Sequence, residues 1–184
     1  VTRPTLGSVG THMRSLVALL LVVLAASAAA DADARPAAHA CTGAQLTGSF
    51  KAVPGSAGAG NITYALVLRN RSHVACQLSG LPSARLLGKT GKPLPTAVRA
   101  AFPGALSAVL VRLAPGARTR ATARFSPDVP GVGEPVSGTH CEPVAYRLRV
   151  NAQGGGTTTV AVTPPTSVCE HGRLLFSAYG IVTG

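Results

Sequence analysis

The 184-residue sequence contains no tryptophan and a single methionine, and aromatic residues make up only 4% of the chain. Without tryptophan the domain lacks the core anchor of antibody-type immunoglobulin domains. The scarcity of aromatic rings also leaves few stacking partners for single-stranded nucleic acid. Met13 is the only thioether, and the four cysteines are expected to be oxidised to disulfides, so the soft ligands that Cu(I) requires are missing elsewhere in the chain. These absences argue against nucleic-acid binding and copper(I) trafficking.

Acidic residues are also scarce: the chain has 6 Asp and Glu against 17 Lys and Arg, a formal net charge of +11. Beyond residue 40 the acids are Asp128, Glu134, Glu142 and Glu170. Hydrolysis by paired carboxylates or by a serine triad needs convergent acidic groups that this set does not offer, and no Gly-x-Ser-x-Gly motif is present. We therefore expect a protein that is not an enzyme and has no cofactor. An extracellular enzyme would need a pocket in which one of these acids meets a histidine and a serine.

No apolar run reaches the ~20 residues of a transmembrane helix. The longest run, Leu16 to Ala30, follows Arg14 and ends in small-residue sites, a pattern typical of an export signal. We predict a signal peptide over residues 1–30, cleaved after Ala28 or Ala30 or before Cys41, a flexible linker over 31–40, and one domain over 41–184. The mature chain is then secreted or associated with the cell envelope, without a membrane span. Cys41 lies too far beyond the apolar run for typical lipid attachment.

The predicted domain contains four cysteines: Cys41, Cys76, Cys141 and Cys169. An even number of cysteines in an exported domain is typical of a disulfide framework. Three pairings are possible. We favour Cys41 with Cys76 and Cys141 with Cys169, each closing a loop of about 30 residues and stabilising the fold by roughly 3–4 kcal/mol.

Alternation of apolar and polar residues dominates the domain, and helical periodicity is nearly absent. The pattern predicts strands at residues 62–69, 74–78, 85–87, 96–99, 108–113, 118–125, 144–150, 157–162 and 174–176, with Val109, Val111 and Leu113 facing the core. Turn residues at 70–72 and at Pro115–Gly116 predict two hairpins, 62–69 with 74–78 and 108–113 with 118–125. The three glycines at 154–156 predict a third, 144–150 with 157–162, and residues 88–92 predict a tight reversal. Residues 126–142 are too rich in proline and glycine for regular structure. We expect an all-β, two-sheet antiparallel sandwich of immunoglobulin-like architecture with two disulfides.

Several short segments occur in a characteristic order. They are Cys41-Thr-Gly-Ala-Gln-Leu46, Tyr64 to Asn70 followed by Cys76-Gln-Leu-Ser-Gly-Leu-Pro82, Leu113-Ala-Pro-Gly116, and Cys141 with Val168-Cys169. Together they resemble a family of exported actinobacterial domains of unknown function, over roughly residues 41–179. The resemblance implies a secreted or lipoprotein β-sandwich with two disulfides and no established activity. It implies a structural role for Asn70 and for Leu78-Ser-Gly80, and it implies no catalytic residue.

The first candidate binding surface is a row of arginines. Arg118, Arg120 and Arg124 share one face of their predicted strand, and the expected hairpin places Arg112 opposite Arg118. Guanidinium groups bind phosphate and carboxylate bidentately. The alternative is a solvated outer face that protects a strand edge from aggregation. If the surface binds a partner, we expect an anionic cell-envelope polymer or another exported protein.

The second candidate is formed by His140-Cys141-Glu142 and Cys169-Glu170-His171. A disulfide between the two cysteines would bring together two imidazoles and two carboxylates, which are ligands that zinc and copper(II) accept. The alternative interpretation is that these residues are charged loop residues beside a surface disulfide and bind no metal. The leading hypothesis is a non-enzymatic interaction module without a metal. A metal-binding envelope protein that uses His140 and His171 is the alternative.

Overall fold

The computed structural model describes residues 2, 38–105, 110–138, 140–141 and 143–181. The predicted signal peptide and residues 31–37 of the predicted linker lie outside the described residues. Among the residues that are described, no helix is both long and apolar enough to cross a membrane. The fold is an all-β, sandwich-like arrangement with two disulfides, which confirms the fold class predicted from the sequence.

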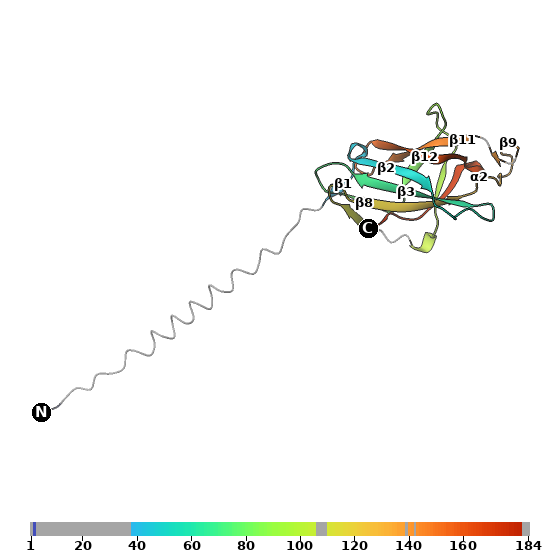
Figure 1. Ribbon diagram of the computed structural model, residues 1–184. Coiled ribbons are helices and arrows are strands. Elements are labelled where there is room, and N and C mark those ends of the chain that lie inside the picture. Colours follow the sequence, from blue (N-terminus) through green and yellow to red (C-terminus); the bar gives the residue numbers. More distant parts are fainter. Residues whose placement is uncertain (1, 3–37, 106–109, 139, 142, 182–184) are drawn as a thin grey trace. The chain divides into compact units, whose positions relative to one another are not determined.

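The larger sheet contains nine strands. They are β2 (Leu46–Ala52), β3 (Ile62–Asn70), β5 (Ser83–Leu87), β6 (Ala97–Ala100), β8 (Arg118–Phe125), β11 (Val144–Asn151), β12 (Thr157–Ser167), β13 (Arg173–Phe176) and β14 (Gly180–Ile181). Their order is β5-β11-β12-β2-β3-β8-β13-β6. β14 pairs with the first half of β8, at Thr119 and Arg120, whereas β13 pairs with the second half. Figure 1 shows β2, β3 and β8 side by side, with β11 and β12 continuing the sheet.

The remaining strands form two smaller sheets. β1 (His39–Ala40), β4 (Cys76–Ser79) and β7 (Leu110–Leu113) form a three-stranded sheet, and β9 (Val136–Ser137) pairs with β10 (His140–Cys141). Short helical turns occur at η2 (Gly43–Gln45), η3 (Pro103–Ala105) and α2 (Cys169–Gly172). In Figure 1, β1 lies at one end of the domain, whereas β9 and α2 lie at the other.

The core lies between the sheets and follows the alternation of β3. Tyr64, Leu66 and Leu68 are fully buried, and the three-stranded sheet contributes Leu78 and Leu113 to the same cluster. Four aromatic rings form its centre, with centroid distances of 5.1 Å, 5.2 Å and 6.2 Å between neighbouring rings; they are Phe50, Tyr64, Phe125 and Phe176. Burial of these large side chains is the main favourable contribution to folding.

The predicted strands are present, and the hairpin predicted between 144–150 and 157–162 is confirmed as the β11–β12 pair. The other two predicted hairpins are wrong. β3 pairs with β2 and β8, whereas β4 pairs with β1 and β7. The turn at Pro115–Gly116 therefore connects the two sheets instead of closing a hairpin between β7 and β8. Turn residues fix where the chain reverses, but they do not fix which sheet receives the next strand. Val111 and Leu113 are buried as predicted, and Val109 lies outside the described residues.

β2 is a strand that the sequence pattern did not indicate, because Gly48 interrupts its apolar alternation. A Cβ at Gly48 would lie 2.1 Å from the carbonyl oxygen of Val67 on β3, so the close approach of the two strands requires glycine. β12 extends to Ser167 rather than ending at 162. It tolerates Pro164 and Pro165 because its pairing with β11 is interrupted there, so no ladder hydrogen bond is lost.

Candidate functional site

A row of exposed arginines follows β8. Arg118, Arg120 and Arg124 are exposed and alternate with buried residues, so they point outward together. The neighbouring strand β3 places Arg69 directly opposite Arg118. We call these four residues the arginine face. Arg112 does not belong to it, because β7 pairs Arg112 with Gln77 in the three-stranded sheet. The prediction that Arg112 lies across from Arg118 is therefore wrong, and Arg69 occupies that position.

The positive charge of the arginine face is not neutralised within the part of the chain that the structure describes. The close contacts between basic and acidic side chains there are Arg173 with Glu170, at 2.7 Å, and His171 with Glu134, at 3.8 Å. Arg69 instead donates from Nε to the carbonyl oxygen of Gly116 at 3.1 Å. Like charges directly opposite each other on a sheet are destabilising, so a bound anion would relieve this repulsion.

A hollow of about 300 Å³ adjoins Arg124. Its lining combines one cation, two hydroxyls and apolar groups: Thr63, Ala101, Phe102, Thr122, Arg124 and Leu175. The Phe102 side chain is one of the most exposed large apolar side chains described, with 69% of its surface accessible. No pattern in the sequence indicates this hollow, because its residues come from three strands and from the segment after β6.

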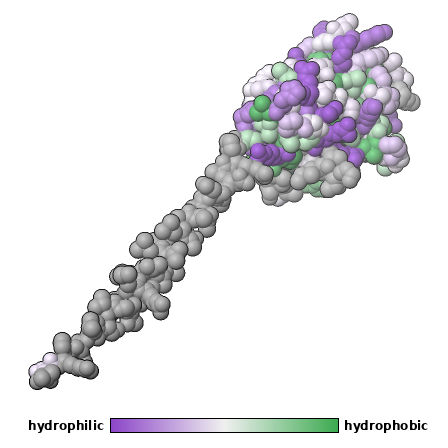
Figure 2. Space-filling view, turned by 60° about the vertical axis from the view of Figure 1, so that its left-hand side comes forward, coloured by the Kyte–Doolittle hydropathy of each residue, from purple (hydrophilic) through white to green (hydrophobic). Residues whose placement is uncertain are grey.

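A second hollow of about 420 Å³ lies over β11 and β12. Lys89, Tyr146 and Arg147 line it together with residues of β12, at the place where the β11–β12 pairing is irregular. It is a separate basic surface and includes none of the arginine face. Figure 2 shows one face of the domain, on which hydrophilic and hydrophobic residues are interspersed.

The two cysteines at the centre of the candidate metal site are joined to each other, as that hypothesis required. The structure pairs Cys41 with Cys76 and Cys141 with Cys169, as predicted. Glu134 lies with its carboxylate within 4.8 Å of both Cys141 and Cys169 sulfurs, but disulfide sulfurs are not thiolate ligands. The His140 side chain and Glu142 lie outside the described residues.

The Glu134 carboxylate is held by backbone amides. The N–H groups of Gly131 and Glu170 donate to Oε2 at 2.6 Å, and that of His171 donates to Oε1. Glu170 and His171 adopt left-handed conformations, with φ of 56° and 58°, so their successive amides form an anion-binding concavity. Burial alone would raise the pKa of the Glu134 carboxyl, but these three donors outweigh it and hold the pKa below its usual value. Glu134 thus fastens α2 to the 126–142 segment and is not a free metal ligand.

We expect this attachment to be lost in acid. Because the pKa of Glu134 is lowered by folding, its contribution to stability is complete above the unfolded value of about 4.5 and disappears as pH falls through the folded value. Glu134→Gln should remove this pH dependence and lower the melting temperature at pH 7 by about 4 °C, the shift given by a loss of roughly 1 kcal/mol. Thermal melts from pH 3 to pH 7 measure both effects.

Glu170→Gln is the matched control, because the partner of this carboxylate among the described residues is the exposed Arg173 guanidinium. Its melting temperature should stay close to that of the wild-type protein at pH 7. A wild-type pH profile that Glu134→Gln leaves unchanged would contradict the role given to the carboxylate.

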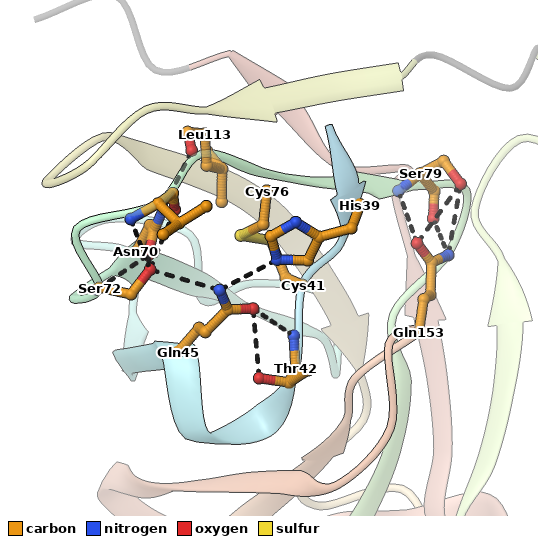
Figure 3. Close-up of a disulfide and its surroundings, with 11 residues drawn as sticks. His39, Cys41, Thr42, Gln45, Asn70, Ser72, Cys76, Ser79, Leu113 and Gln153 are labelled. Atoms are coloured by element: carbon orange, nitrogen blue, oxygen red, sulfur yellow. Dashed lines mark hydrogen bonds between the residues drawn. A yellow bond between two sulfur atoms is a disulfide. The ribbon is translucent and has the colours of Figure 1, made fainter. Parts of the chain in front are cut away.

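The surroundings of Cys41–Cys76 are structural. Figure 3 shows Asn70 directed toward Leu113, and the Gln45 side chain between Thr42 and His39. Asn70 is fully buried and joins the end of β3 to β7. Its position agrees with the structural role that the family resemblance implied.

Comparison with known families gives one match. The domain of unknown function DUF4232 matches residues 41–177 of the chain. The matched range begins at Cys41, the first cysteine of the disulfide framework, and covers β2 to β13. No curated protein and no solved structure matches the chain.

Proposed function

Since the chain belongs to the DUF4232 family, whose function is unknown, we propose a function from its geometry: a non-enzymatic exported module that binds a phosphate-bearing cell-envelope polymer. The observation that carries this proposal is the arginine face. Four exposed guanidinium groups lie on two adjacent strands, and among the described residues they have no acidic partner.

The arrangement of the arginines suits a polymer better than a single small anion. Alternate residues of a strand are about 7 Å apart, so Arg118 and Arg124 are separated by roughly 20 Å along β8. A small anion can touch only part of such a row. A chain of phosphodiesters can place successive phosphates on successive guanidiniums, each accepting a bidentate pair of hydrogen bonds.

Export brings the domain to such polymers. The predicted signal peptide supports secretion, and two disulfides are compatible with an oxidising extracellular setting. The excess of arginine, with a whole-chain formal charge of +11, increases the rate and strength of association with any polyanion outside the cell.

The test is to neutralise the centre of the face. Arg118→Gln/Arg120→Gln should weaken binding to long-chain polyphosphate, and to the anionic polymer fraction of the envelope, by about tenfold near physiological salt, because two phosphate contacts are lost. Binding is measured by titration calorimetry or by retention on the immobilised polymer.

Arg85→Gln/Arg112→Gln is the matched control. It removes the same charge from two exposed arginines outside the arginine face, on β5 and β7. Its binding should change by less than about threefold, the effect expected from net charge alone. Equal losses in the two double variants, or no loss in either, would contradict a localised site.

A further inference from the structure

We propose that the hollow beside Arg124 binds one sugar-phosphate unit, with the phosphate on the Arg124 guanidinium and the sugar ring against Phe102. The inference rests on the proposed function and specifies which unit of the polymer is recognised. The hollow adjoins the arginine face because Arg124 belongs to both.

The polar groups that line the hollow are available for a ligand. Thr63 lies directly opposite Arg124 in the β3–β8 ladder, and Thr122 is the next outward residue along β8. Within the described part of the chain, neighbouring serine hydroxyls contact only the backbone of these two threonines: Ser56 contacts the N–H and carbonyl oxygen of Thr63, and Ser177 accepts from the N–H of Thr122. The two threonine hydroxyls have no hydrogen-bond partner there. Arg124 likewise has no recorded ion pair there. One cation and two hydroxyls can therefore bind the same small molecule.

Phe102 supplies an apolar wall. The residue just before it is fixed, because the Ala101 N–H donates to the Phe176 carbonyl oxygen at 2.8 Å. Leu175 belongs to β13, directly opposite Arg124 on the other side of β8. An exposed aromatic ring beside a cation and hydroxyls offers its apolar body to the C–H face of a sugar while the ligand's polar groups find partners.

The size and chemistry of the hollow restrict the ligand. A volume of about 300 Å³ is at the lower end of small-molecule sites, which suits one unit rather than a stretch of polymer. Inorganic phosphate would leave Phe102 and Leu175 unused. An aliphatic carboxylate brings only two oxygens, fewer than a sugar phosphate offers to Arg124 and the hydroxyls of Thr63 and Thr122 together. A sugar phosphate uses all three kinds of group.

The experiment compares three probes: glucose 1-phosphate, inorganic phosphate and hexanoate. We expect the wild-type protein to bind glucose 1-phosphate most tightly when chemical-shift changes are followed during titration. Phe102→Ala should weaken the binding of glucose 1-phosphate by about tenfold, the loss expected when an aromatic contact is removed. The same variant should leave the affinity for inorganic phosphate unchanged. Arg124→Gln should weaken the binding of both phosphate-containing probes.

Val132→Ala is the control for loss of an exposed apolar side chain, because Val132 is 98% accessible and outside the hollow. It should bind all probes as the wild type does. Tighter binding of hexanoate than of glucose 1-phosphate, or equal binding of glucose 1-phosphate and inorganic phosphate, would overturn the inference. So would an equal effect of Phe102→Ala on both phosphate-containing probes.

The failure of this inference can be distinguished from the failure of the proposed function. If polyphosphate binding depends on Arg118 and Arg120 while Phe102→Ala has no effect on glucose 1-phosphate, only the assignment of the hollow is wrong. If the wild-type protein does not bind the polyanions, the proposed function is wrong whatever the hollow binds.

Discussion

Replacing Asn70 with alanine is expected to lower the free energy of unfolding by about 3–5 kcal/mol. The Asn70 amide donates to the carbonyl oxygens of Val74 at 2.8 Å and Leu113 at 3.0 Å, and its oxygen accepts from the N–H and hydroxyl of Ser72 at 2.9 Å and 2.7 Å. Asn70 is fully buried. The substitution would remove four hydrogen bonds and leave the buried Leu113 carbonyl oxygen and three part-buried groups without this partner, where an unsatisfied buried group costs roughly 1–3 kcal/mol.

Denaturant unfolding followed by circular dichroism measures this effect. Asn61→Ala is the control, because the Asn61 amide makes an exposed hydrogen bond to the carbonyl oxygen of Ala59. Its free energy of unfolding should change by no more than about 0.5 kcal/mol. Equal effects of the two substitutions would show that the Asn70 side chain does not hold the end of β3 to β7.

Loss of the Cys41–Cys76 disulfide is the second large effect. Cys41→Ala/Cys76→Ala should lower the free energy of unfolding by roughly 3–4 kcal/mol, because the bond closes a loop with a sequence separation of 35 and restricts the unfolded chain. Both cysteines are fully buried, so the replacement also removes packed sulfur atoms from the core.

The disulfide pairing is checked separately by a peptide map of the oxidised protein without reductant. Peptides that link Cys41 to Cys76 and Cys141 to Cys169 are expected. A link between Cys76 and Cys141, or free thiols in protein recovered from outside the cell, would contradict the framework. A double variant as stable as the wild type would show that the bond adds nothing to stability.

The sequence indicated most strands because alternation is a local property. In β3 and β8 the period of two is uninterrupted, and both strands lie where the pattern placed them. The strand pairings cannot be predicted from local alternation, since β3 and β8 are distant in sequence. A turn motif also does not determine which strand becomes the partner. For this reason the sequence placed Arg112 opposite Arg118, where the structure has Arg69. Identifying Arg69 requires the β3–β8 pairing.

The remaining features of the site depend on contacts between segments that have no regular pattern. Phe102 follows β6 in a segment without periodicity, and only the fold places it beside Arg124. In the sequence Glu134 is only one of few acids, whereas in the fold its partners include the amides of Glu170 and His171 in left-handed conformations. The residue types alone do not favour this arrangement over a surface charge or a metal ligand.

The salt dependence of polyphosphate binding tests the central claim most directly. The logarithm of the association constant, plotted against the logarithm of the NaCl concentration, should be linear with a slope of about −3 for four phosphate contacts. In Arg118→Gln/Arg120→Gln the magnitude of the slope should fall by about half, whereas Arg85→Gln/Arg112→Gln should keep the wild-type slope. A wild-type slope near zero, or the same slope in all three proteins, would contradict binding through the arginine face.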